Sequence, residues 1–205
     1  MPVTINGNGS ITGLSVGGLP NGIVDTDVLA DNAVTSAKSS LTEGITMIDQ
    51  WRLNSNYTFS NNSTTDLTAN WERNDASYYG GVGSPMTESS GVFNFPITGK
   101  YLIMGYAQFY ASSGSHSSFG LFLNTKVGSG GSFVITAQGW SSGYTTNAYA
   151  YAQLQFLMDI TDTTHDQVKL SAVGNSNRQI LTSSTAQRTQ YLLMHHQQEH
   201  LQVDL

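Results

Sequence analysis

The sequence predicts an all-β protein whose main domain is a sandwich of two sheets. Only 11% of its 205 residues are charged and 21 are glycine, a balance typical of β-sandwiches and fibrous assemblies rather than of helical proteins. Period-two alternation, the pattern of a half-buried strand, recurs from residue 45 onward. Three of the alternating segments carry large uncharged side chains on both faces. Such strands need a packing layer on each face, so we expect another subunit or another element of the chain to cover them.

Composition excludes several classes of function. The net charge is -6, and the eight Lys and Arg residues are scattered, so we expect no nucleic-acid partner. With no cysteine, disulfides and thiol chemistry are excluded. We find no apolar stretch of membrane length and no signal-peptide pattern at the N-terminus, so we expect neither membrane insertion nor secretion by the host pathway.

Residues 1–44 differ from the rest, because they contain no aromatic residue and are punctuated by glycine. Such a segment cannot bury enough apolar area to fold alone. We therefore divide the chain into an extended arm with a short shaft, 1–44, and a head domain, 45–205. Asp25 or Thr26 can cap one short helical turn, and Asn32 or Thr35 can begin another; the alternative is a linker with incidental helix propensity. The apolar residues that we expect to dock on a partner are Ile5, Ile11, Leu14, Val24, Val28, Leu29 and Val34.

The first half of the head begins with a strand at 45–53, followed by a Ser/Thr/Asn-rich loop at 54–66. A short edge strand containing Trp71 is expected within 67–74, and an irregular connection at 75–90.

A strand at 91–95 is broken by Pro96 and turns through Gly99 into a strand at 100–111. One side of that strand carries Tyr101, Ile103, Ala107 and Phe109, and the other carries Leu102, Met104, Tyr106 and Tyr110.

The second half of the head continues the alternation. Strands are expected at 116–124, 133–140, 147–160, 167–173 and 189–196, with a glycine-rich hairpin turn at 125–132, loops at 141–146 and 174–188, and a tail from 197. The segment 147–160 has the most regular alternation, with Tyr149, Tyr151 and Gln153 opposite a face of alanines and aliphatics. The strands at 116–124 and 167–173 are mostly apolar on one face only. Phe122 interrupts the polar face of the first.

The stretch GVFNFPITGKYLIMG, from Gly91 to Gly105, resembles the heart of the trimeric jelly roll shared by the complement globular head and tumour necrosis factor. The resemblance implies a homotrimer. Strands 100–111, 147–160 and 189–196 would form the inner sheet facing the threefold axis, and strands 116–124 and 167–173 the outer sheet facing solvent. The trimer-interface residues expected on this basis are Tyr101, Ile103, Tyr106, Tyr149, Tyr151, Gln153, Tyr191 and Leu193.

A second stretch, VDTDVLADNAVTSAK at 24–38, resembles an element of bacteriophage tail fibres and other virion fibres, where it is often repeated. The resemblance implies a structural fibre of a virion, assembled in the host cytoplasm. Residues 1–44 would attach to a tail or capsid protein, and the head would project toward the host surface. A capsid decoration fibre without a specific ligand is an alternative.

The sequence favours binding over catalysis. No Gly-x-Ser-x-Gly elbow joins a strand to a helix, as a serine hydrolase requires, and no residue pattern places a nucleophile beside any of the histidines. The acids available for a glycosidase pair are Glu72, Asp75, Glu88, Asp159, Asp162 and Asp166. Calcium-loop spacing is absent around the last three. His195, His196 and His200 would be repeated around a threefold axis and could hold a metal, or form an exposed tail. We expect no enzyme, metal or cofactor.

Aromatic residues in or beside the expected loops offer a second kind of binding site. Exposed rings beside Asn and Ser side chains can stack on sugar faces, which would make the head a lectin-like tip. The alternative is that these rings pack the loops onto the sandwich. The candidate receptor contacts are Tyr57, Tyr78, Tyr79, Trp140 and Tyr144.

Overall fold

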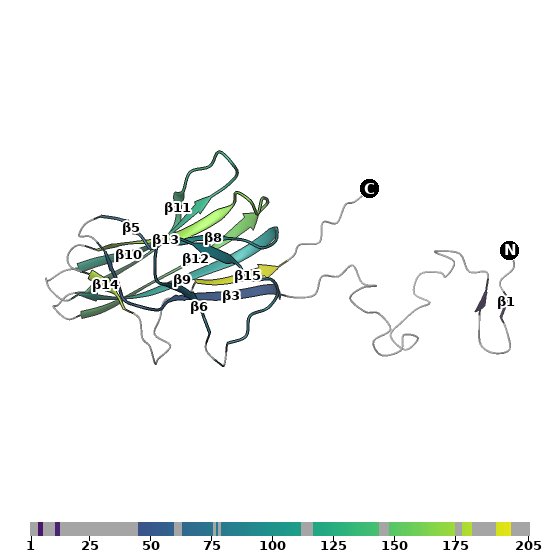
Figure 1. Cartoon of the computed structure of the whole chain (residues 1–205), viewed down its shortest axis with the longest axis horizontal. Helices are drawn as coiled ribbons and strands as arrows, with labels where there is room; N and C mark the ends of the chain where they lie inside the picture. The colour runs from purple at the N-terminus through teal and green to yellow at the C-terminus, as the bar shows by residue number, and fades with distance from the viewer. Residues whose placement is uncertain are drawn as a thin grey trace. The chain divides into compact units, whose positions relative to one another are not determined.

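Figure 1 shows the computed structural model of the chain. It describes residues 4–5, 11–12, 45–59, 63–75, 77, 79–111, 117–143, 148–174, 178–181 and 192–197. Every regular element in these ranges is a strand, which confirms the all-β prediction. The chain divides into two compact units, Met1–Thr42 and Glu43–Leu205, and no helix in the described part is long and apolar enough to cross a membrane.

The first unit contains one short antiparallel pair that the sequence does not predict. Strand β1 (Thr4–Ile5) pairs with β2 (Ile11–Thr12), and Ile5 lies opposite Ile11. The helical turns expected between residues 25 and 38 lie outside the described residues. The same holds for the other arm residues assigned to docking, which are Leu14, Val24, Val28, Leu29 and Val34.

One sheet of the second unit, here called the β9 sheet, has seven strands in the order β4-β14-β9-β15-β3-β6, with β12 on the other edge of β9. All thirteen residues of β9 pair with β12. The opposite edge of β9 is shared between β15 and β14. The bounds are β3 Ile45–Leu53, β4 Tyr57–Phe59, β6 Trp71–Arg73, β9 Gly99–Ala111, β12 Ala148–Ile160, β14 Arg178–Ile180 and β15 Leu192–Gln197.

The other sheet, here called the β10 sheet, has six strands in the order β11-β10-β13-β8-β7, with β5 also paired to β13. Both sheets are antiparallel, and apart from the β7–β8 and β10–β11 hairpins their paired strands are not consecutive in the sequence, which is jelly-roll connectivity. The predicted grouping of the long strands is confirmed: β9, β12 and β15 share one sheet, and β10 and β13 share the other. The bounds are β5 Thr65–Asp66, β7 Thr87–Ser89, β8 Val92–Asn94, β10 Ser117–Lys126, β11 Val134–Gly143 and β13 Gln167–Gly174.

The core lies between the two sheets and is filled by alternate residues of the long strands. Phe109 of β9 stacks on Phe119 of β10 with ring centroids 5.0 Å apart. Phe93 of β8 meets the edges of Trp51 and Trp71 at 5.5 and 5.1 Å. Because a strand turns alternate side chains to opposite faces, each long strand contributes one apolar row to this core.

Several short strands lie where the sequence analysis expected only loops. Strands β4 and β5 fall within 54–66, β7 falls within 75–90, and β14 falls within 174–188. Each has at most three residues, too few for a recognisable period, and each pairs with a neighbouring strand of its sheet. Their strand geometry follows from cross-strand pairing rather than from local propensity.

Two close approaches join the sheets at their rims. A side chain on Gly139 of β11 would place its Cβ 2.0 Å from the backbone oxygen of Gln153 in β12. At the end of the sandwich, the buried Asp166 carboxylate accepts hydrogen bonds from the amides of Gly128, Thr161 and Asp162, each at 2.9 Å. Burial alone would raise the pKa of Asp166, but these amide donors outweigh it and lower the pKa.

Candidate functional site

The outward face of β9 and β12, turned away from the core, exposes large side chains. Tyr149 is 56% exposed, Tyr151 48% and Leu157 62%. None of the outward residues between 102 and 110, or between 149 and 157, is charged. Together they are called the β9–β12 face: Leu102, Met104, Tyr106, Gln108, Tyr110, Tyr149, Tyr151, Gln153, Gln155 and Leu157.

The register of β9 and β12 pairs these side chains into a ladder. Tyr149 lies opposite Tyr110, with ring centroids 5.3 Å apart. Tyr151 stacks on Tyr106 at 5.9 Å, and its hydroxyl oxygen accepts a hydrogen bond of 3.0 Å from Nε2 of the buried Gln108. Cross-strand contacts of this kind hold the rings in place without covering them.

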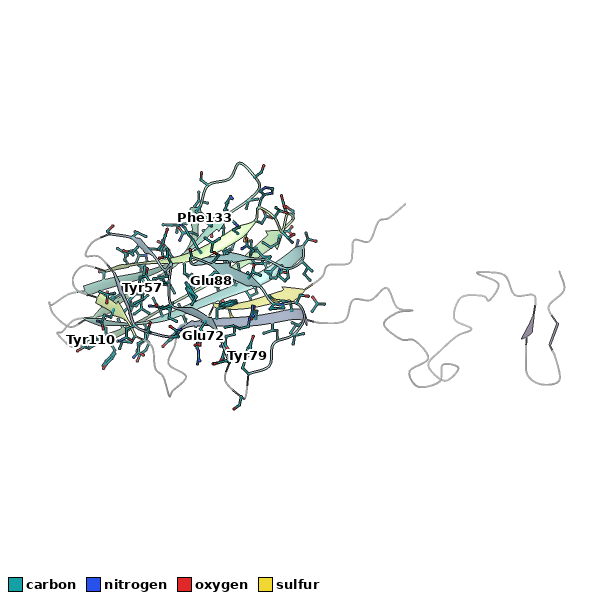
Figure 2. All side chains as sticks on the ribbon, viewed as in Figure 1. Tyr57, Glu72, Tyr79, Glu88, Tyr110 and Phe133 are labelled. Carbon is teal, nitrogen blue, oxygen red and sulfur yellow. The ribbon has the colours of Figure 1, made fainter. Side chains whose placement is uncertain are left out.

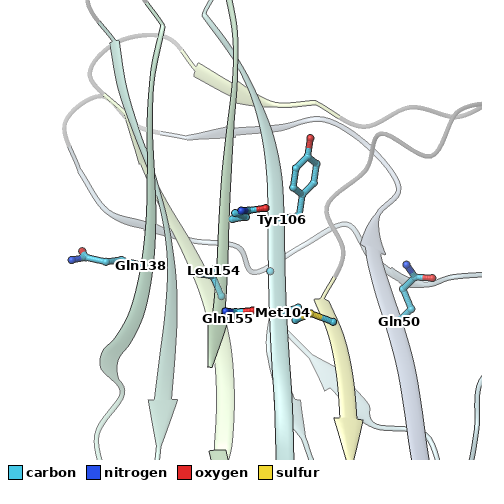
Figure 3. A pocket seen from close by; sticks show the side chains of 8 residues that line it. Gln50, Met104, Tyr106, Gln138, Leu154 and Gln155 are labelled. Atoms are coloured by element: carbon cyan, nitrogen blue, oxygen red, sulfur yellow. The ribbon is translucent and has the colours of Figure 1, made fainter. Parts of the chain in front are cut away.

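A groove of about 610 Å³ crosses the middle of the face. Figure 3 shows Met104 and Tyr106 on β9 between Gln50 of β3 on one side and the side chains of β12 on the other. Gln138 reaches the groove from β11, the edge of the opposite sheet. The lining is therefore amide, aromatic and thioether, and its residues are Gln50, Met104, Gly105, Tyr106, Gln138, Gln153, Leu154 and Gln155.

The nearest charged pair lies at one end of this ladder of paired side chains on β9 and β12. Lys100 pairs with Asp159 across β9 and β12, with Nζ 3.4 Å from Oδ2. An uncharged, aromatic-rich centre with ions at the rim is the composition of a protein–protein interface. Exposed apolar patches of this kind usually mark an interaction site.

Two residues assigned to the trimer interface point the other way, and their assignment is wrong. Tyr101 and Ile103 are completely buried in the sandwich core, because odd-numbered positions of β9 face inward there. The hydroxyl of Tyr101 donates to the carbonyl oxygen of Ile97 at 2.9 Å. Burial raises the pKa of Tyr101 to about 12.

The other interface candidates divide into two groups. Four of them, Tyr106, Tyr149, Tyr151 and Gln153, belong to the β9–β12 face. Leu193 lies in β15 between Met104 and Gln50 in the register, but its side chain is not described, and Tyr191 lies outside the described residues.

The outward face of the β10 sheet is not the plain polar surface that the sequence predicts. Phe122, expected to interrupt a face exposed to water, is only 4% exposed. It is packed against Trp140 of β11, with ring centroids 5.4 Å apart and an interplanar angle of 73°. The register places Trp140, Gly120 and Val173 side by side across β11, β10 and β13, so Phe122 is covered within a single chain.

Trp140 lies within β11 and is 55% exposed, as a receptor contact would be. Tyr57 and Tyr79, labelled in Figure 2, do not fit that assignment, because both are partly buried. The Tyr57 hydroxyl donates to the carbonyl oxygen of Asp66 at 2.9 Å. The Tyr79 hydroxyl accepts from the Gln50 amide at 2.9 Å. These two rings pack connections onto the sandwich; Tyr78 and Tyr144 lie outside the described residues.

Tyr79 also belongs to a buried polar cluster around Asp49 that the sequence does not signal. The Asp49 carboxylate, 1% exposed, accepts from Trp51 Nε1, Arg73 Nε and the Met86 amide at 2.9–3.0 Å. Burial raises the pKa of the Tyr79 hydroxyl, and the neighbouring negative charge of Asp49 adds to the effect. Because the carboxylate is saturated by protein donors, it ties β3 to β6 and to residue 86.

The acids considered for catalysis are engaged by protein groups. Glu72 and Asp75 both pair with Arg52, at 3.0 and 2.5 Å, and Glu88 accepts from the Gly91 amide at 2.6 Å. Asp162 contacts Nδ1 of His165 at 2.6 Å, and that hydrogen bond lowers the pKa of Asp162.

The described residues contain no group of three potential metal ligands. His195 and His196 lie in β15, where side chains are not described, and His116 and His200 lie outside the described residues.

The fold resembles that of solved structures of the tumour necrosis factor class. Eiger TNF from S. frugiperda superposes with a TM-score of 0.57 and 11% identity, over 78% of this chain and 97% of that one. Murine APRIL gives a TM-score of 0.50 and 9% identity, over 74% of this chain and 98% of that one. No protein-family model and no curated protein sequence matches the chain. At these identities the likeness shows the jelly-roll fold alone.

Proposed function

We propose that three copies of this chain associate through their β9–β12 faces, and that the trimer is the binding head of a fibre on a bacteriophage particle. The observation that carries the proposal is the exposure of Tyr149, Tyr151 and Leu157 on an uncharged sheet face. Exposure of these large apolar side chains to water is unfavourable. Burying it against a partner recovers about 25 cal/mol for each Å² of apolar surface removed from solvent.

A second copy is the partner that the surface fits best. The groove offers a receptor surface of amide and aromatic groups, and the same chain supplies uncharged amide and aromatic side chains to fill it. The Lys100–Asp159 pair at the rim gives each copy both signs of charge to place against the other. Threefold closure is supported by the resemblance of Gly91–Gly105 to the trimeric jelly rolls.

The virion role is supported by the sequence of the arm. The stretch 24–38 resembles an element of bacteriophage fibres, and the glycine-rich composition of residues 1–44 suits a segment that is ordered by its partner. In this proposal the arm docks on a tail or capsid protein, and Ile5 and Ile11, opposite each other in β1 and β2, belong to the docking segment. The head acts by multivalent binding rather than by bond-making.

Sedimentation equilibrium on the whole chain tests the trimer. We expect a single species of three times the 22.1 kDa chain mass at micromolar concentration. A monomer that stays soluble and folded at that concentration would overturn the proposal, because the β9–β12 face would then be exposed to water without a partner.

Mass spectrometry of gradient-purified particles tests the virion role separately. We expect peptides of this chain to co-purify with the other structural proteins at a fixed ratio. Their absence from purified particles, together with an intact trimer in solution, would refute the virion assignment and leave the assembly standing.

A further inference from the structure

The outward face of the β10 sheet presents one tryptophan that is fixed but not covered. Tryptophan is usually well buried in folded proteins, yet Trp140 is 55% exposed. Its Nε1 donates to Oε1 of Gln138 at 3.2 Å, and its ring packs edge-to-face with Phe122. The indole is therefore held by two contacts on its own sheet while much of its surface faces solvent.

Gly120 provides the space in which this ring rests. A Cβ at Gly120 would lie 2.7 Å from Cζ of Phe122, 2.9 Å from Cγ1 of Val173 and 3.2 Å from Cη2 of Trp140. Side chains from three strands thus converge over one glycine, and a larger residue at this position would force them to shift. Because the ring is ordered before any ligand arrives, binding loses little side-chain entropy. We call Trp140, Gln138, Ser118 and Ser142 the Trp140 platform.

The surroundings of the ring are polar and uncharged. In the register, Ser142 and Ser118 form the next row on one side of Trp140, and Gln138, Phe122 and Ser171 form the next row on the other. Ser118, Gln138 and Ser142 are exposed. The nearest outward-facing ions in this register are Asp66 and Lys169, and these pair with each other at 2.5 Å. Nothing in this described patch offers an unpaired charge to an ionic ligand.

The patch is too small and too polar for the centre of a protein interface. Such an interface buries about 800 Å² on each side around an apolar core. Phe122 is already covered, so the large exposed apolar side chain of the Trp140 platform is the indole itself, and the next one along β11, Ile135, lies beyond Gln138. A single ring edged by hydroxyl and amide groups matches a pyranose, whose C–H face stacks on an aromatic ring while its hydroxyls take hydrogen bonds.

We propose that the Trp140 platform binds a sugar residue of an uncharged glycan, with the pyranose stacked on Trp140, its hydroxyls bonded to Ser118 and Ser142, and Gln138 holding the indole in place. The site rests on the proposed binding-head function and supplies its ligand class. One platform is a weak site, and a trimer carries three, so avidity provides useful retention on a glycan-coated surface.

The test is a titration of the whole chain with neutral oligosaccharides of glucose, mannose, galactose and N-acetylglucosamine, followed by tryptophan fluorescence and calorimetry. Polygalacturonate serves as the charged control. We expect at least one neutral sugar to bind and to change the Trp140 emission. Trp140→Ala should weaken that binding about tenfold or more, whereas Trp140→Tyr, which keeps a ring, should retain most of it.

Ile135→Ser is the matched control, because Ile135 is a 52% exposed residue of the same strand, outside the platform; it should bind like the wild type. The proposal is overturned if no neutral sugar binds, if Trp140→Ala binds as well as the wild type, or if polygalacturonate binds equally well. Melting curves show whether each variant is folded. If Trp140→Ala does not fold, Trp140→Tyr is the variant whose binding is compared with the wild type. Sedimentation of the same samples separates this outcome from failure of the trimer.

Discussion

Two outward apolar residues of the sandwich, Phe122 on the β10 sheet and Leu157 on the β9 sheet, are in opposite situations. On the β10 sheet, Phe122 is 4% exposed because Trp140 lies against it within the same chain. On the β9 sheet, Tyr149 and Leu157 are more than half exposed. A large apolar side chain on the outward face of a strand can therefore be covered within the same chain, or stay exposed until a partner covers it. Only the cross-strand neighbours distinguish them.

The strongest way to break this comparison is to place the same new charge on each face. Leu157→Asp puts a carboxylate in the surface proposed to join the copies, where burying it costs several kilocalories per mole. We expect this variant to sediment as a folded monomer. Ser142→Asp, on the exposed surface of β11, should keep the mass of the wild type. Equal masses for the two variants would place the contact between copies elsewhere.

Truncation to alanine sharpens the comparison, because it separates cover within the chain from cover by a partner. Phe122→Ala removes a ring buried within the chain and should lower the free energy of unfolding by about 3 kcal/mol at any protein concentration. Leu157→Ala, at a 62% exposed position, should lower the melting temperature only at concentrations at which the wild type is associated. Calorimetry over a hundredfold range of concentration checks both, and a concentration-independent loss in Leu157→Ala would contradict the assignment.

Asp166 tests the end of the sandwich, independently of either face. Asp166→Asn weakens three amide hydrogen bonds to a carboxylate and should lower the free energy of unfolding by about 2 kcal/mol at neutral pH. Because the folded state lowers the pKa of Asp166, its contribution is complete above the unfolded pKa of about 3.9 and is lost as the pH falls through the lower folded value. The two stability curves should converge in acid, whereas Asp75→Asn, at an exposed position away from the β9–β12 face, should follow the wild type.

The smallest expected effect belongs to Tyr101, which the resemblance wrongly assigned to the trimer interface. Tyr101→Phe removes one hydrogen bond and should lower the free energy of unfolding by about 1 kcal/mol without changing the assembly mass. Since the folded state raises the pKa of Tyr101 to about 12, the wild type loses stability as the pH rises from about 10 toward that value. The variant should lack this loss in alkaline unfolding curves, and a change in its assembly mass would return Tyr101 to the interface.

The long strands could be predicted because they contain enough residues for the alternation of period two to be recognised. Thirteen residues of β12 alternate without a break, and that alternation separates Ala150 and Ala152, which are buried, from Tyr149 and Tyr151, which are exposed. Together with the resemblance, the alternation also grouped β9 and β15 with β12, and β10 with β13, whereas β3 and β11 were not assigned to a sheet. It could not find β7 or β14, whose three residues pair only because a neighbouring strand is present.

The candidate surfaces were predictable only in part, because they depend on register. Nothing in the sequence indicates that Gly120, Trp140 and Val173 share one row, so the covering of Phe122 could not be foreseen. The groove likewise collects Gln50, Gln138 and Gln155 from three strands distant in sequence. Tyr101 and Ile103 were assigned to the interface by resemblance. Odd-numbered and even-numbered residues of β9 lie on different faces of the sheet, so these two residues lie on the face away from Tyr106.

The bare backbone of Gly139 has a consequence for how the protein avoids unwanted polymerisation. Strands β11 and β12 each end their sheet along the described residues, and a terminal strand offers unpaired amides and carbonyls to any passing chain. Because β11 approaches the Gln153 backbone more closely than any Cβ would allow, the two rims shield each other. An alanine at this position would force the two rims apart and expose both edge strands to pairing with strands of other chains.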